Sequence, residues 1–168
     1  MKRFSSMFVL AIVSFLSLQA YAAPAYIIIL RHGEKNSDES RHLSPKGYRR
    51  ATALAKQFSS SAFEKRFGRP AALFSASDEG DRSKRSVETL EPSAKALSLK
   101  IDNSFVKGDE HELIEAIRKD ENLDGKTVVI SWSHTSIPRF LKQFDIEGKK
   151  KCRTSRGDKC SIHPTTAS

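Results

Sequence analysis

One short segment constrains the fold of this chain more than any other. Residues 26–30 read YIIIL, an uninterrupted run of large and mostly β-branched side chains. A strand with one face in water alternates polar and apolar residues, whereas a strand buried on both faces is apolar throughout. Strands of the second kind occur in parallel sheets that helices cover on both sides. The run therefore predicts a strand in the interior of an α/β domain.

The remaining sequence alternates strands with helices. Apolar runs predict strands at residues 71–74 and 127–132, and a short strand is expected around 99–101. Apolar residues at helical spacing predict helices at residues 45–58, 83–97, 110–119 and 137–144. Pro92 should kink or break the second of these helices, because proline lacks the N–H that a helix interior needs. The alternation predicts a three-layer α/β/α sandwich with a mainly parallel central sheet.

The first residues indicate an export signal. Lys2 and Arg3 precede an apolar run at residues 7–18, and Ala20-Tyr21-Ala22 follows with the small-x-small pattern of a signal peptidase site. The run is too short to span a membrane, which takes about 20 apolar residues. We therefore predict a signal peptide at 1–22, a mature domain at 23–168 without a membrane anchor, and a periplasmic or secreted location.

Composition excludes some classes of protein and leaves others open. Of the 168 residues, 38% are hydrophobic and 29% charged, so the chain can bury a core and is not of the disordered class. The formal net charge of +9 suits an anionic partner. No interleaving of aromatic with basic residues indicates specific binding to nucleic acid.

The basic tail at 148–168 is expected to form a loop. It contains both cysteines, Cys152 and Cys160, which lie eight residues apart in a polar stretch. In an exported protein such a pair favours a structural disulfide that closes the loop. Two free thiols, or thiols that bind a metal beside His163, are the alternatives.

Histidines and arginines follow the predicted strands. Arg31 and His32 come directly after the first strand, Arg82 and Arg85 follow the second, and His134 follows the strand at 127–132. In open α/β sheets the ligand site lies beyond the carboxyl ends of the strands, so these side chains should meet at one edge. Guanidinium groups offer a rigid fork of donors that matches phosphate.

Four segments in this order carry a resemblance to a known family. They are RHGEK at 31–35, HLSPKGYRRATALA at 42–55, SASDEGDRSKRSVET at 75–89 and VVISWSHTSIP at 128–138. Together they resemble the histidine phosphatase superfamily, the phosphoglycerate mutase-like proteins, over most of the mature chain. Arg50 stands where the family commonly has Gln, and Ser133 replaces the usual Gly. Family members often add a strand near the C-terminus, which the tail is not expected to form.

For a protein already expected to be exported, the resemblance implies a phosphatase that needs neither metal nor cofactor. His32 would attack the phosphorus of a small phosphorylated substrate, a phosphomonoester or phosphohistidine, and water would then hydrolyse the phosphohistidine. Arg31 and Arg85 would hold the phosphoryl oxygens, with Arg82 as the alternative to Arg85, and His134 would donate to the same oxygens. A non-catalytic protein of the same fold that binds a phospho-ligand is the alternative function.

The sequence leaves the general acid open. The acid phosphatase branch of the family carries Asp directly after the second histidine, where this chain has Thr135. In the mutase-like branch the acid is a carboxylate some way after the second arginine, which favours Glu110, with Asp109 nearly as good. Such an acid should have a raised pKa. The alternatives are that both residues only favour a helix N-terminus, or that no dedicated acid exists, as in small members acting on phosphohistidine.

Overall fold

A mainly parallel sheet forms the centre of the computed structural model, which describes residues 23–37, 40–80, 82–144 and the backbone of 160–162. Within these residues the sheet has five strands in the order β3-β2-β4-β1-β5. They are β1 (Tyr26–Arg31), β2 (Pro70–Ser75), β3 (Ile101–Asp102), β4 (Thr127–Trp132) and β5 (Cys160–Ile162). All pairings are parallel except that of β5 with β1. The predicted sheet is therefore confirmed.

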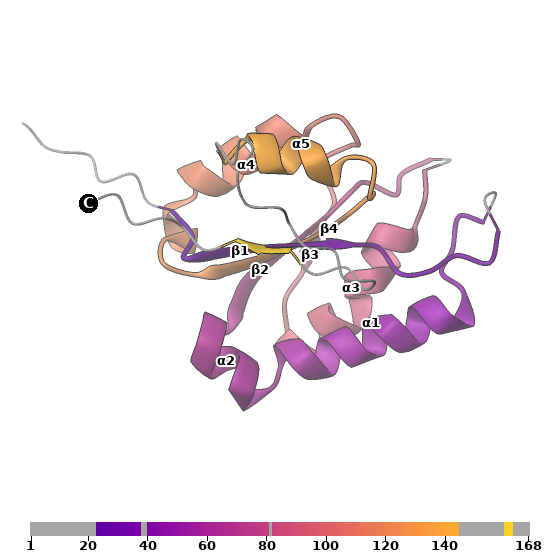
Figure 1. Ribbon diagram of the computed structural model, residues 1–168, viewed down its shortest axis with the longest axis horizontal. Coiled ribbons are helices and arrows are strands. Elements are labelled where there is room, and N and C mark those ends of the chain that lie inside the picture. Colours follow the sequence, from indigo (N-terminus) through magenta and orange to yellow (C-terminus); the bar gives the residue numbers. More distant parts are fainter. Residues whose placement is uncertain (1–22, 38–39, 81, 145–159, 163–168) are drawn as a thin grey trace, which may run out of the picture.

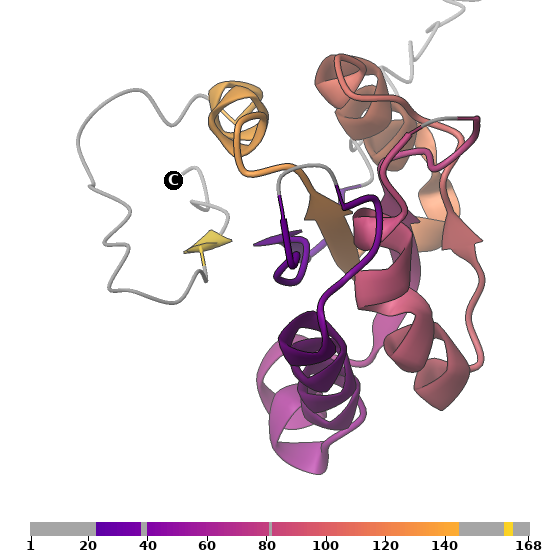
Figure 2. The same cartoon turned by 90° about the vertical axis from the view of Figure 1, so that its right-hand side faces the viewer.

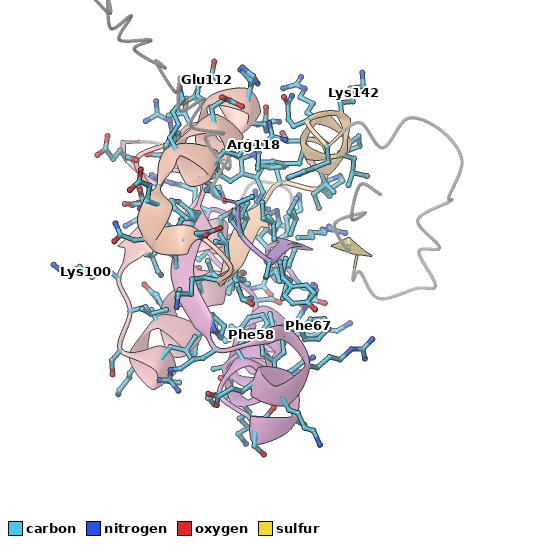
Figure 3. The ribbon with its side chains drawn as sticks, turned by 90° about the vertical axis from the view of Figure 1, so that its left-hand side faces the viewer. Phe58, Phe67, Lys100, Glu112, Arg118 and Lys142 are labelled. Atoms are coloured by element: carbon cyan, nitrogen blue, oxygen red, sulfur yellow. The ribbon has the colours of Figure 1, made fainter. Side chains whose placement is uncertain are left out.

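Helices cover both faces of this sheet (Figure 1). On one face lie α1 (Pro45–Phe58), α2 (Ser61–Phe67) and α3 (Arg85–Leu97). On the other lie α4 (Glu110–Lys119) and α5 (Ile137–Lys142), with a 3₁₀ turn, η1 (Glu121–Leu123), after α4. This is the predicted three-layer α/β/α sandwich. Figure 3 shows the layers through labelled side chains: Phe58 of α1 and Phe67 of α2 on one side, Glu112 of α4 and Lys142 of α5 on the other.

Each face of the sheet has its own apolar core, and the central strands contribute to both. Ile130 and Trp132 of β4 belong to the core shared with α4 and α5, whereas Val129 belongs to the core shared with α1 and α3. In β1, Ile29 and Leu30 divide in the same way. Alternate side chains of a strand point to opposite faces. The continuous apolar runs are explained, because both faces of these strands are buried.

Three elements differ from the sequence predictions. The helix α2 was not predicted, because its seven residues are too few to show a helical stripe. Pro92 lies inside α3, which neither breaks nor ends there. Leu90 and Leu97 of α3 are buried in the core that they share with β2 and β4, and such tertiary packing outweighs the local cost of proline.

The third difference concerns the tail. The prediction that residues 148–168 form only a loop is wrong at β5, which pairs antiparallel with β1 from Ile27 to Ile29. Without β5, β1 would present an open row of backbone donors and acceptors, and a short strand that covers such an edge satisfies them.

Two predictions fall largely outside the described residues. The signal peptide at 1–22 is one, and the disulfide is the other, since Cys152 and the side chain of Cys160 are not described. In the part of the chain that the structure describes, no helix is both long enough and apolar enough to cross a membrane.

Candidate active site

The two histidine-bearing segments leave neighbouring strands at the same edge of the sheet. Arg31 and Trp132 are partners at the ends of β1 and β4. The backbone N–H of His32 donates to the Trp132 carbonyl at 3.0 Å, which extends the pairing by one residue. His134 follows Trp132 by two residues on an exposed turn. Figure 2 views the molecule from the side on which the chain leaves β1 toward α1.

The imidazole of His32 is buried and held in one orientation. The residue is only 6% exposed, and its Nδ1 lies 2.7 Å from the carbonyl oxygen of Gly33. Because a carbonyl can only accept, Nδ1 carries the proton and donates. The lone pair of the neutral ring is then on Nε2, which is the atom available to attack an electrophile.

The surroundings of His32 favour the neutral imidazole. Burial lowers the pKa of His32 below its usual 6.5, although the hydrogen bond to the Gly33 carbonyl acts in the opposite direction. The positive charges of Arg85, Arg31 and His134 lower this pKa further. The structure therefore brings all four of these predicted residues into one electrostatic environment.

Arg85, rather than Arg82, is the arginine of the second segment that affects His32. Arg85 is the first residue of α3 and is half-buried, and its Nε donates to Ser83 Oγ at 2.6 Å. Arg82 is exposed, and its Nη1 donates to the Glu79 carbonyl at 3.2 Å. The predicted alternative, with Arg82 in place of Arg85, has less support from this arrangement.

A threonine joins the nucleophile segment to α3. Thr89 is fully buried, and its Oγ1 accepts from the backbone N–H of Gly33 at 2.8 Å. The same hydroxyl donates to the Arg85 carbonyl at 2.6 Å. One side chain therefore fixes His32, through its neighbour Gly33, relative to Arg85.

Two glycines allow the segment after β1 to lie directly on α1. A Cβ on Gly33 would lie 3.1 Å from the Cα of Gly47. A Cβ on Gly47 would clash with the carbonyl oxygen of Glu34 and lie 3.0 Å from its amide nitrogen. The start of α1 is fixed by Ser44, whose Oγ accepts from the Gly47 N–H and whose N–H donates to the Glu34 carbonyl. The glycines of the first two family-like segments thus make one backbone contact.

Glu88 is a buried carboxylate that the sequence predictions did not single out. Its Oε1 lies 2.5 Å from His42 Nδ1, and its Oε2 accepts from the Leu43 N–H at 2.8 Å. It joins the segment before α1 to α3, one residue from Thr89. The His42 side chain is 58% exposed, and this contact anchors its ring.

Glu110 differs from the general acid expected at its position. It is only 2% exposed, and its Oε1 accepts from Trp132 Nε1 at 3.0 Å and from the Gly108 N–H at 3.3 Å. Burial alone would raise the pKa of its carboxyl. The neighbouring Ser136 hydroxyl makes no hydrogen bond of regular geometry, but together with the Trp132 indole and the backbone N–H groups of Gly108 and Glu110 it outweighs burial, and the pKa is lowered. A general acid should have a raised pKa, and the pKa of Glu110 is lowered instead.

The other acid candidates have structural partners of their own. The alternative carboxylate, Asp109, accepts from the Val106 N–H at 2.9 Å through Oδ2. Thr135, at the place of the aspartate of the acid phosphatase branch, shares a hydrogen bond of 3.0 Å with Ser133 Oγ. Among the described residues, no three His, Cys, Asp or Glu side chains are grouped so that they could hold a metal ion.

Comparisons with known proteins bear on the fold. The sequence matches no family model and no curated protein. A solved mycobacterial glucosyl-3-phosphoglycerate phosphatase is similar in structure, with a TM-score of 0.52 and 12% identity over 71% of this chain and 79% of its own. A structure described as mycobacterial hydrolase 1 gives a TM-score of 0.51 and 13% identity, over 71% of this chain and 78% of its own.

These likenesses define the class of fold. This chain shares its fold with these two solved structures, and membership of the family that the four sequence segments resemble stays a prediction. At this level of identity the likeness is one of fold, and the activity depends on the residues that this chain places at the strand ends.

Proposed function

We propose that this protein is a phosphatase that transfers the phosphoryl group of a small phosphomonoester, or of phosphohistidine, first to His32 and then to water. The observation that carries the proposal is the state of His32. Its ring is buried, its Nδ1 is bound to the Gly33 carbonyl, and Arg85, Arg31 and His134 lower its pKa. A neutral imidazole with an available Nε2 is a nucleophile, and the cationic surroundings suit a phosphoryl dianion.

The proposed reaction has two displacements. In the first, the Nε2 lone pair of His32 forms a bond to phosphorus while the bond from phosphorus to the leaving atom breaks, and the leaving atom keeps the electron pair of that bond and takes a proton from water. In the second, a water oxygen attacks the phosphohistidine, the N–P bond breaks, and inorganic phosphate leaves with the neutral ring restored. The low pKa of His32 favours both steps, because the ring stays unprotonated near neutral pH and is a better leaving group than a more basic amine.

The other residues have electrostatic roles in this proposal. Arg31 and Arg85 hold the phosphoryl oxygens, and His134 donates to an equatorial oxygen, on which charge accumulates in the transition state. Loss of one such donor should lower kcat about 100- to 1,000-fold, by analogy with an oxyanion hole. These side chains supply positive charge directly, so the proposal requires no metal.

The direct test compares two histidine variants. We expect the purified protein to hydrolyse p-nitrophenyl phosphate, His32→Ala to abolish this activity, and His111→Ala, on the exposed side of α4, to leave it unchanged. Brief incubation with ³²P-labelled substrate should label wild type in an acid-labile form and should not label His32→Ala. Equal turnover by wild type and His32→Ala would show that His32 is not the nucleophile.

A non-catalytic phospho-ligand-binding protein is the second candidate. The lowered pKa of Glu110 and the pairing of Thr135 with Ser133 favour it, since neither residue is poised to protonate a leaving group. Binding of inorganic phosphate that Arg85→Gln weakens, without turnover of any phosphate ester, would support this candidate over the phosphatase.

We also propose that the protein acts outside the cytoplasm, with residues 1–22 removed and Cys152 bridged to Cys160. The apolar run and the small-x-small pattern support cleavage after Ala22. Mass spectrometry of protein recovered from the periplasm or medium should give a chain that begins at Ala23. Its mass should be 2 Da lower than the mass of the same chain after reduction.

A further inference from the structure

Glu110 makes contacts that suit a role other than proton transfer. Glu110 is the first residue of α4, and its carboxylate is buried against β4 and α5. One oxygen accepts from the Trp132 indole and the Gly108 backbone, and the other lies 3.6 Å from Arg139 Nη1. One oxygen is therefore hydrogen-bonded to donors of the protein itself, and the other forms an ion pair with Arg139.

Trp132 connects this carboxylate to both histidines of the site. Its carbonyl accepts from the His32 N–H, and His134 lies two residues further along the chain. Its ring is fully buried and packs edge-on against Phe140 of α5, with centroids 5.4 Å apart and planes at 86°.

Glu110 also reaches the far end of the His134 segment. This segment, residues 133–136, is closed by a turn in which the Ser136 N–H donates to the Ser133 carbonyl at 3.0 Å. Trp132 precedes the segment, and Arg139 follows it in the first turn of α5. The Glu110 carboxylate thus contacts a residue before the segment and a residue after it, and neighbours the buried Ser136 within it.

We infer that Glu110 is a positioning residue, which fixes both ends of segment 133–136 and so holds His134 in place for the phosphoryl group that His32 attacks. The inference deepens the proposed function and rests on it. Ionisation of the carboxylate suits this role, because hydrogen bonds to a charged acceptor are stronger than those to a neutral one. A general acid, by contrast, must carry a proton at the working pH.

The first experiment distinguishes positioning from acid catalysis by the leaving group. kcat/KM is measured for wild type and Glu110→Gln with aryl phosphates whose phenols differ in pKa. A positioning residue predicts the same loss, about 10- to 100-fold, for every ester, because misplacement of His134 affects phosphoryl transfer whatever leaves. A loss that grows with the pKa of the phenol and vanishes for the best leaving group would overturn the inference.

The second experiment tests whether Glu110 acts through Trp132. Trp132→Phe removes the indole N–H and keeps an aromatic ring against Phe140, and it is combined with Glu110→Gln in a double-mutant cycle on kcat/KM. We expect the double variant to be no worse than the poorer single variant by more than about 3-fold. Losses that multiply would show that the two residues act independently and would overturn the inference.

Control variants and a folding measurement show whether a loss of activity comes from Glu110 itself. Glu112→Gln changes an exposed glutamate on the same helix, labelled in Figure 3, and should leave activity unchanged. Far-UV circular dichroism of each variant establishes folding, and Glu110→Gln is preferred to Ala because it removes the charge without leaving a cavity in the buried site.

An inactive wild type would count against the proposed function without deciding the role of Glu110. In that case the same cycle is measured on the Kd for orthovanadate, by calorimetry. Weaker binding in Glu110→Gln that does not multiply with Trp132→Phe supports the positioning role. Unchanged vanadate affinity in Glu110→Gln, or absence of vanadate binding by wild type, overturns it.

Discussion

The backbone N–H of Gly33 donates to the buried hydroxyl of Thr89 at 2.8 Å, and this hydroxyl donates in turn to the Arg85 carbonyl. The residue after the proposed nucleophile is thereby joined to the helix turn that carries a proposed phosphate ligand. Strand β1 and helix α3 are far apart in the sequence, so no local interaction could set this distance.

Thr89→Val should therefore impair both stability and activity. Valine has nearly the shape of threonine but cannot accept, so the buried Gly33 N–H loses its partner, at a cost of about 1–3 kcal/mol in the free energy of unfolding. We also expect kcat to fall while KM changes less. Urea denaturation and steady-state kinetics check this, with Thr89→Ser, which keeps the hydroxyl, as the matched control. Equal stability of the two variants would contradict the argument.

Gly47→Ala should destabilise the protein although it lies in a helix. Alanine in place of glycine ordinarily stabilises a helix interior by about 1 kcal/mol. Here the new Cβ would clash with the Glu34 carbonyl, whose oxygen also accepts from the Ser44 N–H, so backbone must move. We expect a loss of about 1–3 kcal/mol, as for overpacked cores.

Thermal or urea unfolding measures the effect of Gly47→Ala, and Thr52→Ala, an exposed position of the same helix, serves as the control for helix propensity. A Gly47→Ala variant more stable than wild type would show that the contact between Gly47 and Glu34 is not tight.

The fold was predictable where local sequence and burial agree. The run at 26–30 could only be a strand covered on both faces, and Ser44 with Pro45 marked the start of α1. The strand β5 was not predictable, because its three residues become a strand only through the edge of β1 that they cover. The persistence of α3 through Pro92 likewise depends on packing rather than on local preference.

In the candidate site too, some residues could be predicted from the sequence and others depend on tertiary contacts. His32, Arg31, Arg85 and His134 could be selected from sequence because the carboxyl ends of parallel strands meet at one edge. The burial of Glu88 could not be predicted from the sequence, since a single glutamate in a helix gives no sign of which partners it meets. The direction of the Glu110 pKa depends on Trp132, twenty-two residues away, and on the start of α5.

Cleavage after Ala22 should create an ion pair. The backbone nitrogen of Ala23 lies 3.0 Å from Asp124 Oδ1, and the Ala23 carbonyl accepts from the Gly125 N–H. If Ala23 is the mature N-terminus, this nitrogen is an ammonium group and the hydrogen bond becomes charge-assisted. We expect Asp124→Asn to lower the pKa of the α-amino group in the mature chain, measured by its pH-dependent labelling. An α-amino pKa that the variant leaves unchanged would contradict the pairing.

The imidazole of His32 should titrate below its usual pKa of 6.5, because burial and the positive charges of Arg85, Arg31 and His134 disfavour its protonated form. The acidic limb of kcat/KM should therefore fall below this value. NMR titration identifies the His32 signal as the one missing in His32→Asn. Arg85→Gln should move its pKa upward, since one of the three positive charges is removed. A midpoint at or above 6.5 in wild type would contradict the assigned environment.

The same shift makes the stability of the protein depend on pH. Because the pKa of His32 is lower in the folded state, the unfolded chain binds the proton more readily. The free energy of unfolding should then decrease as pH falls from about 6.5 toward the folded-state pKa, and should not change through this group above about 6.5. His32→Asn removes this contribution, while the carboxylates affect both proteins alike. Urea denaturation on either side of this window should show a smaller acid-induced loss in the variant than in wild type, and equal losses would mean that the buried ring does not resist protonation.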